Sequence, residues 1–255
     1  MRLHLKILRL SFPLSFFGFY PLWGLDEARL QLSPSFLSGD CFTQSLDKNR
    51  SVPQQLKLEK PFLDKIPYVV GTAKHSFLEM GMVLNQNTGV LRMGQDTALE
   101  FRKAHSYFLH RGSLLFSHRE TIVWKFFIEE NLIGIKATGT WMMERLSSGL
   151  KIILLEGELS SGESAASRML SSGEMIIINS KNPSGTQPIA VDLPLLLGTS
   201  RLVNAFPHPL PSSSRLFSAA QVQALRLKRR YNAFIGDVTK DSKLQLWKLP
   251  QNKKD

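Results

Sequence analysis

Short runs of apolar, β-branched and aromatic residues alternate with turn residues over positions 68–179. One run, ALEFRKA (98–104), alternates with a period of two, so Leu99 and Phe101 point to one face and Glu100 and Arg102 to the other. About ten such runs occur, and no stretch keeps a helical period for more than about three turns. This pattern predicts a mainly β fold of short stacked hairpins, either sandwich or solenoid-like, with one C-terminal α-helix.

The tetrapeptide LSSG occurs three times in this region, at 146–149, 159–162 and 170–173. Serine hydroxyls bond to nearby backbone and glycine tolerates positive φ, so the tetrapeptide suits a turn that follows a buried leucine. The first copy separates WMMER from LKIILLE, which predicts a β-hairpin. Chance recurrence of common turn residues is the alternative. Under either interpretation the strands are short.

The segments on either side of residues 68–180 differ from this region in composition and hydrophobic pattern. Residues 26–67 lack a sustained period and are predicted to form an irregular lead-in to a β-domain over 68–180. Residues 181–214 contain six of the 13 prolines and are predicted to be extended. Residues 215–255 are predicted to form a C-terminal helix and basic tail, with Ser218 and Gln221 at capping-box spacing.

The amino terminus has the pattern of a targeting signal. A basic start is followed by uncharged, mostly apolar residues from Leu10 to Leu25, and two acidic residues then end the run. The run is shorter than the roughly 20 residues that a membrane-spanning helix needs, and it contains two prolines. We therefore predict a signal peptide at 1–25 and export to the periplasm or cell envelope. A retained anchor and a cytoplasmic start are the alternatives.

Charge and cysteine content agree with an exported globular protein. The formal net charge of +11 is concentrated in the two ends of the chain, whereas residues 26–213 are nearly neutral. Because residues 26–213 are nearly neutral, the charge distribution does not favour a nucleic-acid-binding groove. The single cysteine, Cys41, is expected in a loop and cannot form an internal disulfide.

Recognised catalytic patterns are missing from the sequence. It has no Gly-rich phosphate loop, nucleophile elbow or zinc-protease helix motif. The spacing of His105, His110 and His118 does not favour a metal site. We predict no catalytic residues, no cofactor and no metal. The aromatic residues Trp124, Trp141 and the Phe126-Phe127 pair are expected in the core, with a carbohydrate-stacking face as the alternative.

A basic run follows the predicted helix, at Arg226, Lys228, Arg229 and Arg230. These residues are candidates for electrostatic contact with lipid, polysaccharide or another anionic polymer. The alternative is a solvated helix end, where cations interact favourably with the helix dipole.

Several glycines and apolar runs resemble the FecR-type domain family. The matching residues are Gly139-Thr140, Trp141-Met142-Met143, Gly149, Leu155-Glu156-Gly157 and Gly173-Glu174, with an upstream strand pair at Arg111-Gly112 to Phe116. The resemblance covers roughly 90–180, and it departs from the family pattern at Thr138 and Met142. It implies an all-β envelope domain in which Gly112, Gly139, Gly149, Gly157 and Gly173 are structural turn glycines.

Members of that family relay a signal through a transmembrane helix to a cytoplasmic anti-sigma segment. Only nine residues precede the apolar run here, so the relay is not expected. The sequence therefore predicts a non-enzymatic exported FecR-type protein that binds a protein or polymer partner in the bacterial cell envelope, with a role in envelope signalling. The alternatives are an enzyme acting on envelope polysaccharide and a membrane-surface module anchored by an uncleaved amino terminus.

Overall fold

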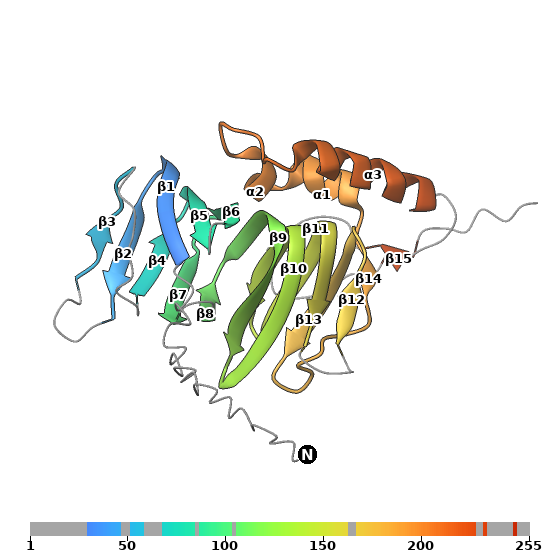
Figure 1. Ribbon diagram of the computed structural model, residues 1–255, viewed down its shortest axis with the longest axis horizontal. Coiled ribbons are helices and arrows are strands. Elements are labelled where there is room, and N and C mark those ends of the chain that lie inside the picture. Colours follow the sequence, from blue (N-terminus) through green and yellow to red (C-terminus); the bar gives the residue numbers. More distant parts are fainter. Residues whose placement is uncertain are drawn as a thin grey trace, which may run out of the picture.

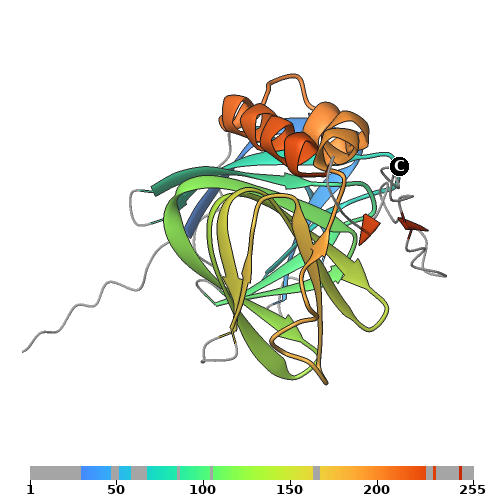
Figure 2. The same cartoon turned by 90° about the vertical axis from the view of Figure 1, so that its right-hand side faces the viewer.

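A large curved β-sheet with helices along one side forms the structure, so the predicted mainly β fold is confirmed (Figures 1 and 2). The computed structural model describes residues 30–46, 52–58, 68–84, 87–103, 106–162, 167–227, 232–233 and 247–248. The predicted signal peptide, His105 and the basic residues Lys228, Arg229 and Arg230 lie outside these ranges.

The main sheet has 14 strands over the described residues. They are β1 (Leu30–Ser38), β2 (Cys41–Ser45), β3 (Gln54–Gln55), β4 (Tyr68–Thr72), β5 (Phe77–Leu84), β6 (Asn87–Met93), β7 (Ala98–Lys103), β8 (Ser106–Arg111), β9 (Ser113–Ile128), β10 (Asn131–Leu146), β11 (Gly149–Ser161), β12 (Arg168–Leu170), β13 (Glu174–Asn179) and β14 (Ile189–Ala190). The helices are α1 (Leu193–Thr199), α2 (Arg201–Asn204) and α3 (Ser213–Leu227), called here the helix layer. A separate pair joins β15 (Asn232–Ala233) to β16 (Trp247–Lys248).

The long strand β9 is the branch point of the sheet. One side pairs along its whole length with β10, which continues through β11 and β13 to β14. On the other side, the first half of β9 pairs with β6, which leads to β5 and β1. The second half pairs with β8 in parallel, and that branch continues through β7, β4 and β2. The two branches enclose a shared inner core.

Aromatic residues fill this inner core. Trp124 and Trp141 are at most 1 % exposed, and Phe126 is fully buried. The ring of Phe116 stacks on that of Trp141 with their centroids 4.4 Å apart. These residues are core residues, as predicted. Phe127 differs, because it faces outward with the guanidinium of Arg102 over its ring at 4.8 Å.

The central strands are longer than the sequence predicts. β9 and β10 each have 16 residues and β11 has 13. The polar stretch SHRET (117–121) looks like a turn in the sequence but lies inside β9. The register there shifts from Ala137 opposite Ile122 to Gly139 opposite His118, so the strand bulges instead of reversing.

The three LSSG copies have three different structures. The first is the predicted hairpin turn, with Leu146 paired to Gly149. The second is the end of β11, and only Gly162 lies beyond the strand. The third joins β12 to β13, which both pair with β11, so it is a bulge along one edge of that strand and not a chain reversal.

The predicted irregular lead-in at 26–67 is wrong over much of its length. It contains β1, β2 and β3, and β1 pairs with β5 along almost its whole length. Leu32 of β1 is fully buried. Cys41 is the first residue of β2 and not a loop residue, and burial raises the pKa of its thiol to about 11.

The predicted extended segment at 181–214 is also wrong, because it forms α1 and α2. Pro194 lies in the first turn of α1, where a missing N–H breaks no helical hydrogen bond. Asp192 caps that helix by accepting a hydrogen bond from the Leu195 amide at 3.0 Å. Helix α3 begins at Ser213, and Ser218 lies inside it with its hydroxyl bonded to the Ser214 carbonyl, so the predicted capping box is wrong.

A second apolar core lies between the helix layer and the outer face of the sheet. β11 separates the two cores, since Leu154 packs into the inner core and Leu155 into this second core. The helix-side residues are Leu193, Leu196, Leu202, Leu210, Leu216 and Ala220.

A fully buried arginine on β6 fixes one end of the helix layer. Arg92 pairs with Glu79 through Nε at 2.7 Å and donates to the backbone carbonyls of Leu202, Val203 and His208. Its guanidinium also lies 4.3 Å from the Phe206 ring centroid. A cation is favourable at carbonyls that end a helix such as α2, and here it joins that helix to the sheet.

Replacing this arginine by an apolar residue of similar length is expected to destabilise the fold strongly. In Arg92→Met, Glu79 keeps a buried charge without its partner, so the free energy of unfolding should fall by about 3–5 kcal/mol. Urea unfolding measures this change. The matched control is Arg111→Met, which removes the exposed Arg111–Asp96 pair and should cost less than about 1 kcal/mol. Equal effects of the two substitutions would contradict the assigned role of Arg92.

Candidate functional site

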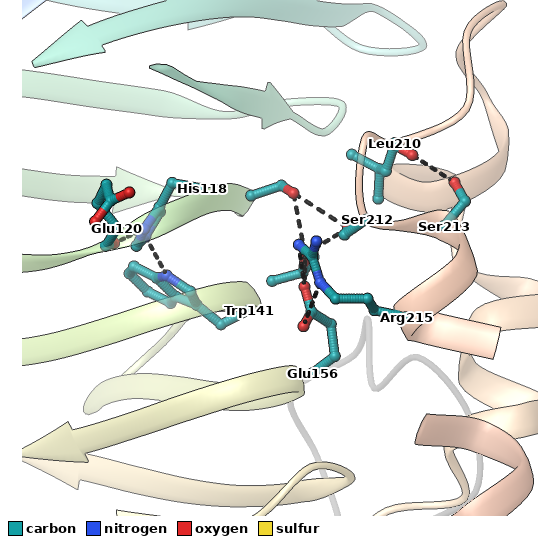
Figure 3. Close-up of polar contacts among 10 residues, drawn as sticks. His118, Glu120, Trp141, Glu156, Leu210, Ser212, Ser213 and Arg215 are labelled. Atoms are coloured by element: carbon teal, nitrogen blue, oxygen red, sulfur yellow. Dashed lines mark hydrogen bonds and ion pairs between the residues drawn. The ribbon is translucent and has the colours of Figure 1, made fainter. Parts of the chain in front are cut away.

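Three polar residues form a row across the outer face of the central strands. Register places Ser117 of β9 opposite Thr140 of β10, and Thr140 opposite Glu156 of β11. Ser212 and Arg215, at the start of α3, approach this row from the helix layer (Figure 3). We call these five residues the interlayer cluster.

The members of the interlayer cluster are densely hydrogen bonded. Thr140 Oγ1 donates to Glu156 Oε1 at 2.9 Å. Ser212 Oγ lies 2.6 Å from Thr140 Oγ1 and 3.2 Å from Ser117 Oγ. Arg215 donates to both carboxylate oxygens of Glu156 at 3.1 Å (Figure 3). These hydrogen bonds raise the pKa of the Arg215 guanidinium above its ordinary value.

A β-bulge at Leu155 brings Glu156 to this face. Thr140 pairs with Glu156 but Trp141 pairs with Leu154, so Leu155 is an extra residue in β11. Before the bulge, odd-numbered residues of β11 face the helix layer; after it, even-numbered residues do. Without this change of side, the carboxylate would point into the apolar inner core.

Two opposed glycines make the bulge possible. Gly139 of β10 and Gly157 of β11 face each other, with φ of 100° and 101°. A β-carbon on either residue would collide with a carbonyl oxygen of the other strand, that of Glu156 or Thr138. Two of the predicted structural glycines therefore allow the strands to approach closely beside the interlayer cluster.

His118 is next to Ser117 in sequence but belongs to the other face. Its Nδ1 is 2.8 Å from the Glu120 carbonyl, and its Nε2 lies 3.4 and 3.3 Å from the indole nitrogens of Trp124 and Trp141. Two indole donors and a carbonyl acceptor fit a neutral ring protonated on Nδ1. Burial lowers the pKa of His118 below its ordinary value.

The interlayer cluster is therefore a structural site and not an open catalytic one. Ser117 and His118 point to opposite faces, so they cannot act as a nucleophile and its base. The Glu156 side chain is 7 % exposed, and Arg215 occupies both of its oxygens. The other buried carboxylates have basic partners too, since Glu79 pairs with Arg92 and Glu100 with Arg102, and the half-buried Glu144 pairs with Lys151.

An open groove adjoins the interlayer cluster on the same face of the sheet. Register places Thr138 opposite Glu158 and Lys136 opposite Ser160, in the two rows beyond Thr140 and Glu156. We call this hollow of about 170 Å³ the outer groove, and its lining is Thr121, Lys136, Ala137, Thr138, Glu158, Leu159, Ser160 and Met169. It offers hydroxyls, both signs of charge and a thioether side chain that is 72 % exposed.

Apart from Gly139 and Gly157, which face each other, the predicted site residues are not brought together. Gly112 lies between β8 and β9, Gly149 begins β11 directly after the first hairpin turn, and Gly173 lies in the bulge between β12 and β13. The carbonyl of Gly173 accepts a hydrogen bond from Gln223 of α3 at 3.0 Å. Arg226 is in α3, and the structure describes its backbone only.

Neither the interlayer cluster nor the outer groove was predicted from the sequence. The one available signal was Glu156 itself, a charged residue in the apolar run LKIILLE, which had to find a partner if buried. Ser212 and Arg215 are distant in sequence and gave no signal.

His110 of β8 pairs with Glu100 of β7. The buried His118 has other partners, the indole nitrogens of two tryptophans. Within the part of the chain that the structure describes, no group of three or more His, Cys, Asp or Glu side chains is arranged to hold a metal ion. Across those same residues, no helix is both long and apolar enough to span a membrane.

Comparison of the chain with family models, with curated proteins and with solved structures found no match.

Removing the Thr140 hydroxyl tests whether the interlayer cluster stabilises the fold. Thr140→Val keeps the shape but removes one buried hydrogen bond from the Glu156 carboxylate and one from Ser212, so the free energy of unfolding should fall by about 1–3 kcal/mol. Thr138→Val is the matched control, because its hydroxyl bonds only the exposed Thr121 and its loss should change stability by less than about 0.5 kcal/mol. Denaturant unfolding of both variants would contradict the assignment if Thr138→Val cost as much as Thr140→Val.

The buried, neutral His118 should make stability depend on pH. The folded pKa is depressed, so the unfolded chain binds a proton first as the pH falls through about 6.5. Stability from this residue is complete above that pH and is lost as the pH falls towards the folded pKa. Unfolding at pH of about 7.5 and about 5.5 should show a smaller pH dependence for His118→Gln than for the wild type. An unchanged dependence would show that other groups cause it.

Proposed function

We propose that the protein is a non-enzymatic binding module of the bacterial cell envelope, exported and of the FecR type that its sequence resembles. It holds a protein or polymer partner in the outer groove and serves envelope signalling through that contact.

The observation that carries this proposal is that the helix layer covers only part of the outer face of the sheet. The outer face of β9, β10 and β11 is covered up to the row of Ser117, Thr140 and Glu156, and it continues beyond that row as the outer groove. The groove has a regular floor, because Thr138 and Lys136 face Glu158 and Ser160 across one strand pair. Side chains on rigid strands present a preformed surface, which lowers the entropic cost of binding.

The chemistry of the outer groove favours an extended, polar partner. Thr121, Thr138 and Ser160 present hydroxyls that both donate and accept hydrogen bonds, and Lys136 and Glu158 add one charge of each sign. Amide groups of a peptide and hydroxyl groups of a glycan match such a lining. Met169 provides an adaptable apolar contact at the rim.

The absence of a free acid–base pair among the described buried carboxylates supports binding over catalysis. Glu79 and Glu156 bind arginines of neighbouring elements, and Glu100 binds Arg102 of its own strand and His110 of β8. A glycosidase needs two carboxyl groups that face one cleft, roughly 5–10 Å apart.

Quantitative capture from envelope extract tests the proposal. We expect the immobilised chain to retain a partner, and the double variant Lys136→Glu/Met169→Ser to retain at least about tenfold less. The matched control is Val52→Ser, which changes an apolar side chain that is 74 % exposed at another part of the surface and should capture as the wild type does. Equal capture by the groove variant would contradict the outer groove as the binding surface.

Cell fractionation and an activity assay on the pure chain test the proposed location and the enzyme alternative. Recovery of the protein from the cytosolic fraction alone would contradict the envelope location. Release of soluble sugars from isolated envelope polysaccharide by the pure chain would favour the enzyme.

A further inference from the structure

The helix layer lies in a stretch of chain without acidic residues. No Asp or Glu occurs from 193 to 236, which includes α1, α2 and α3. The same stretch contains six basic residues, namely Arg201, Arg215, Arg226, Lys228, Arg229 and Arg230. Six basic and no acidic residues give this stretch of the sequence a positive net charge, whereas acidic residues are spread through the sheet region.

The exposed side of α3 is apolar where a solvated helix is normally charged. Phe217, Val222 and Leu225 are 65, 47 and 68 % exposed. At about 100° per residue they fall within an arc of roughly 140°, opposite the buried Leu216, Ala220 and Gln223. The uncharged residues Ser214, Ser218 and Gln221 complete this arc, which we call the α3 outer face.

Packing fixes the direction of the α3 outer face. Gln223 accepts a hydrogen bond from the Leu193 amide at 2.7 Å and donates to the carbonyls of Gly173 and Val191. Near the start of the helix, Arg215 pairs with Glu156 of β11. The helix therefore cannot rotate to bury Phe217 or Leu225 without breaking these bonds. Figure 2 shows α3 next to α1 in the helix layer, lying over the sheet.

We propose that the α3 outer face docks on an anionic phospholipid bilayer. Apolar side chains that project from a fixed helix enter the boundary between headgroups and acyl chains, and the Arg and Lys residues of this stretch of the sequence are attracted to anionic headgroups. The combination of exposed apolar side chains with basic residues indicates the class of partner. Nucleic acid and acidic polysaccharide explain the basic bias, but they provide no apolar phase for Phe217 and Leu225.

Charge complementarity also argues against a second copy of this chain as the occupant. Two α3 outer faces brought together would bring together two helix layers that contain Arg201, Arg215 and Arg226 and no acidic residue, and like charges repel. An anionic bilayer removes this repulsion and accepts both components of the surface.

Bilayer docking extends the proposed function but uses a different surface. The α3 outer face belongs to the helix layer, whereas the outer groove lies on the uncovered part of the sheet. A bilayer-docked chain would therefore keep Lys136 and Met169 free for a partner.

Vesicle cosedimentation of the full chain tests the docking proposal. The probes are vesicles of phosphatidylcholine alone and vesicles with about one third phosphatidylglycerol, at low and at physiological salt. We expect binding to the anionic vesicles, weaker binding to phosphatidylcholine, and a decrease with salt. The double variant Phe217→Gln/Leu225→Gln should bind the anionic vesicles at least about tenfold more weakly.

The control removes apolar side chains of similar exposure elsewhere. Val123→Gln/Leu132→Gln changes residues that are 46 and 47 % exposed on β9 and β10, and it should bind vesicles as the wild type does. Unchanged thermal transitions confirm that both double variants are folded. The groove variant Lys136→Glu/Met169→Ser should also keep its vesicle binding, so failure of the outer groove is distinguished from failure of docking.

Three results would overturn the docking proposal. Equal binding by wild type and Phe217→Gln/Leu225→Gln would place any membrane contact elsewhere in the chain. Equal binding to neutral and anionic vesicles would remove the electrostatic component. No binding to either vesicle would exclude the bilayer as the occupant.

Discussion

The helix layer depends on polar groups that pair across its interface with the sheet. Apolar contact between the two layers is not directional and would tolerate sliding of the helices. The direction comes from Arg92 at one end, the interlayer cluster in the middle and Gln223 at the other end. Each joins a backbone or side-chain group of the helix layer to a defined position on the sheet. A shift of the helices would leave these buried groups unpaired, which is more costly than a lost apolar contact.

The glycine pair in β10 and β11 supports the same interface from the sheet side. The close approach at Gly139 and Gly157 allows the bulge at Leu155, and the bulge turns Glu156 towards Arg215. These two glycines were singled out in the sequence as turn glycines. Their structural role is different, because they lie in the middle of long strands and change which side of a strand faces the helices.

The sequence predicted the parts of the fold where local pattern and tertiary environment agree. ALEFRKA is predicted as a half-buried strand and is one, with Leu99 and Phe101 in the core and Glu100 paired to Arg102 on the opposite face. β1 was missed because its serines and Pro34 disfavour a strand locally, and pairing with β5 overrides that preference. The start of α3 was missed because Ser212 directs its hydroxyl to Thr140 on the sheet, a contact that helix-capping rules cannot anticipate.

The interlayer cluster could not be predicted for a related reason. Its members come from three strands and one helix, and their alignment depends on a one-residue bulge that no local pattern reveals. The outer groove follows from the same bulge, since Glu158 and Ser160 face outward only after Leu155 has shifted the alternation. The FecR resemblance rests on glycines and apolar runs, and it remains a prediction of family and function.

The position of β11 between two cores has a consequence for how the molecule opens. Leu154 and Leu155 are adjacent in the chain but contribute to different sides of the sheet, so one short backbone segment is part of both packing arrangements. A fluctuation that releases the helices also exposes the middle of this strand, and a fluctuation of the strand loosens both layers. We therefore expect the helices and the central strands to open together, as one cooperative unit.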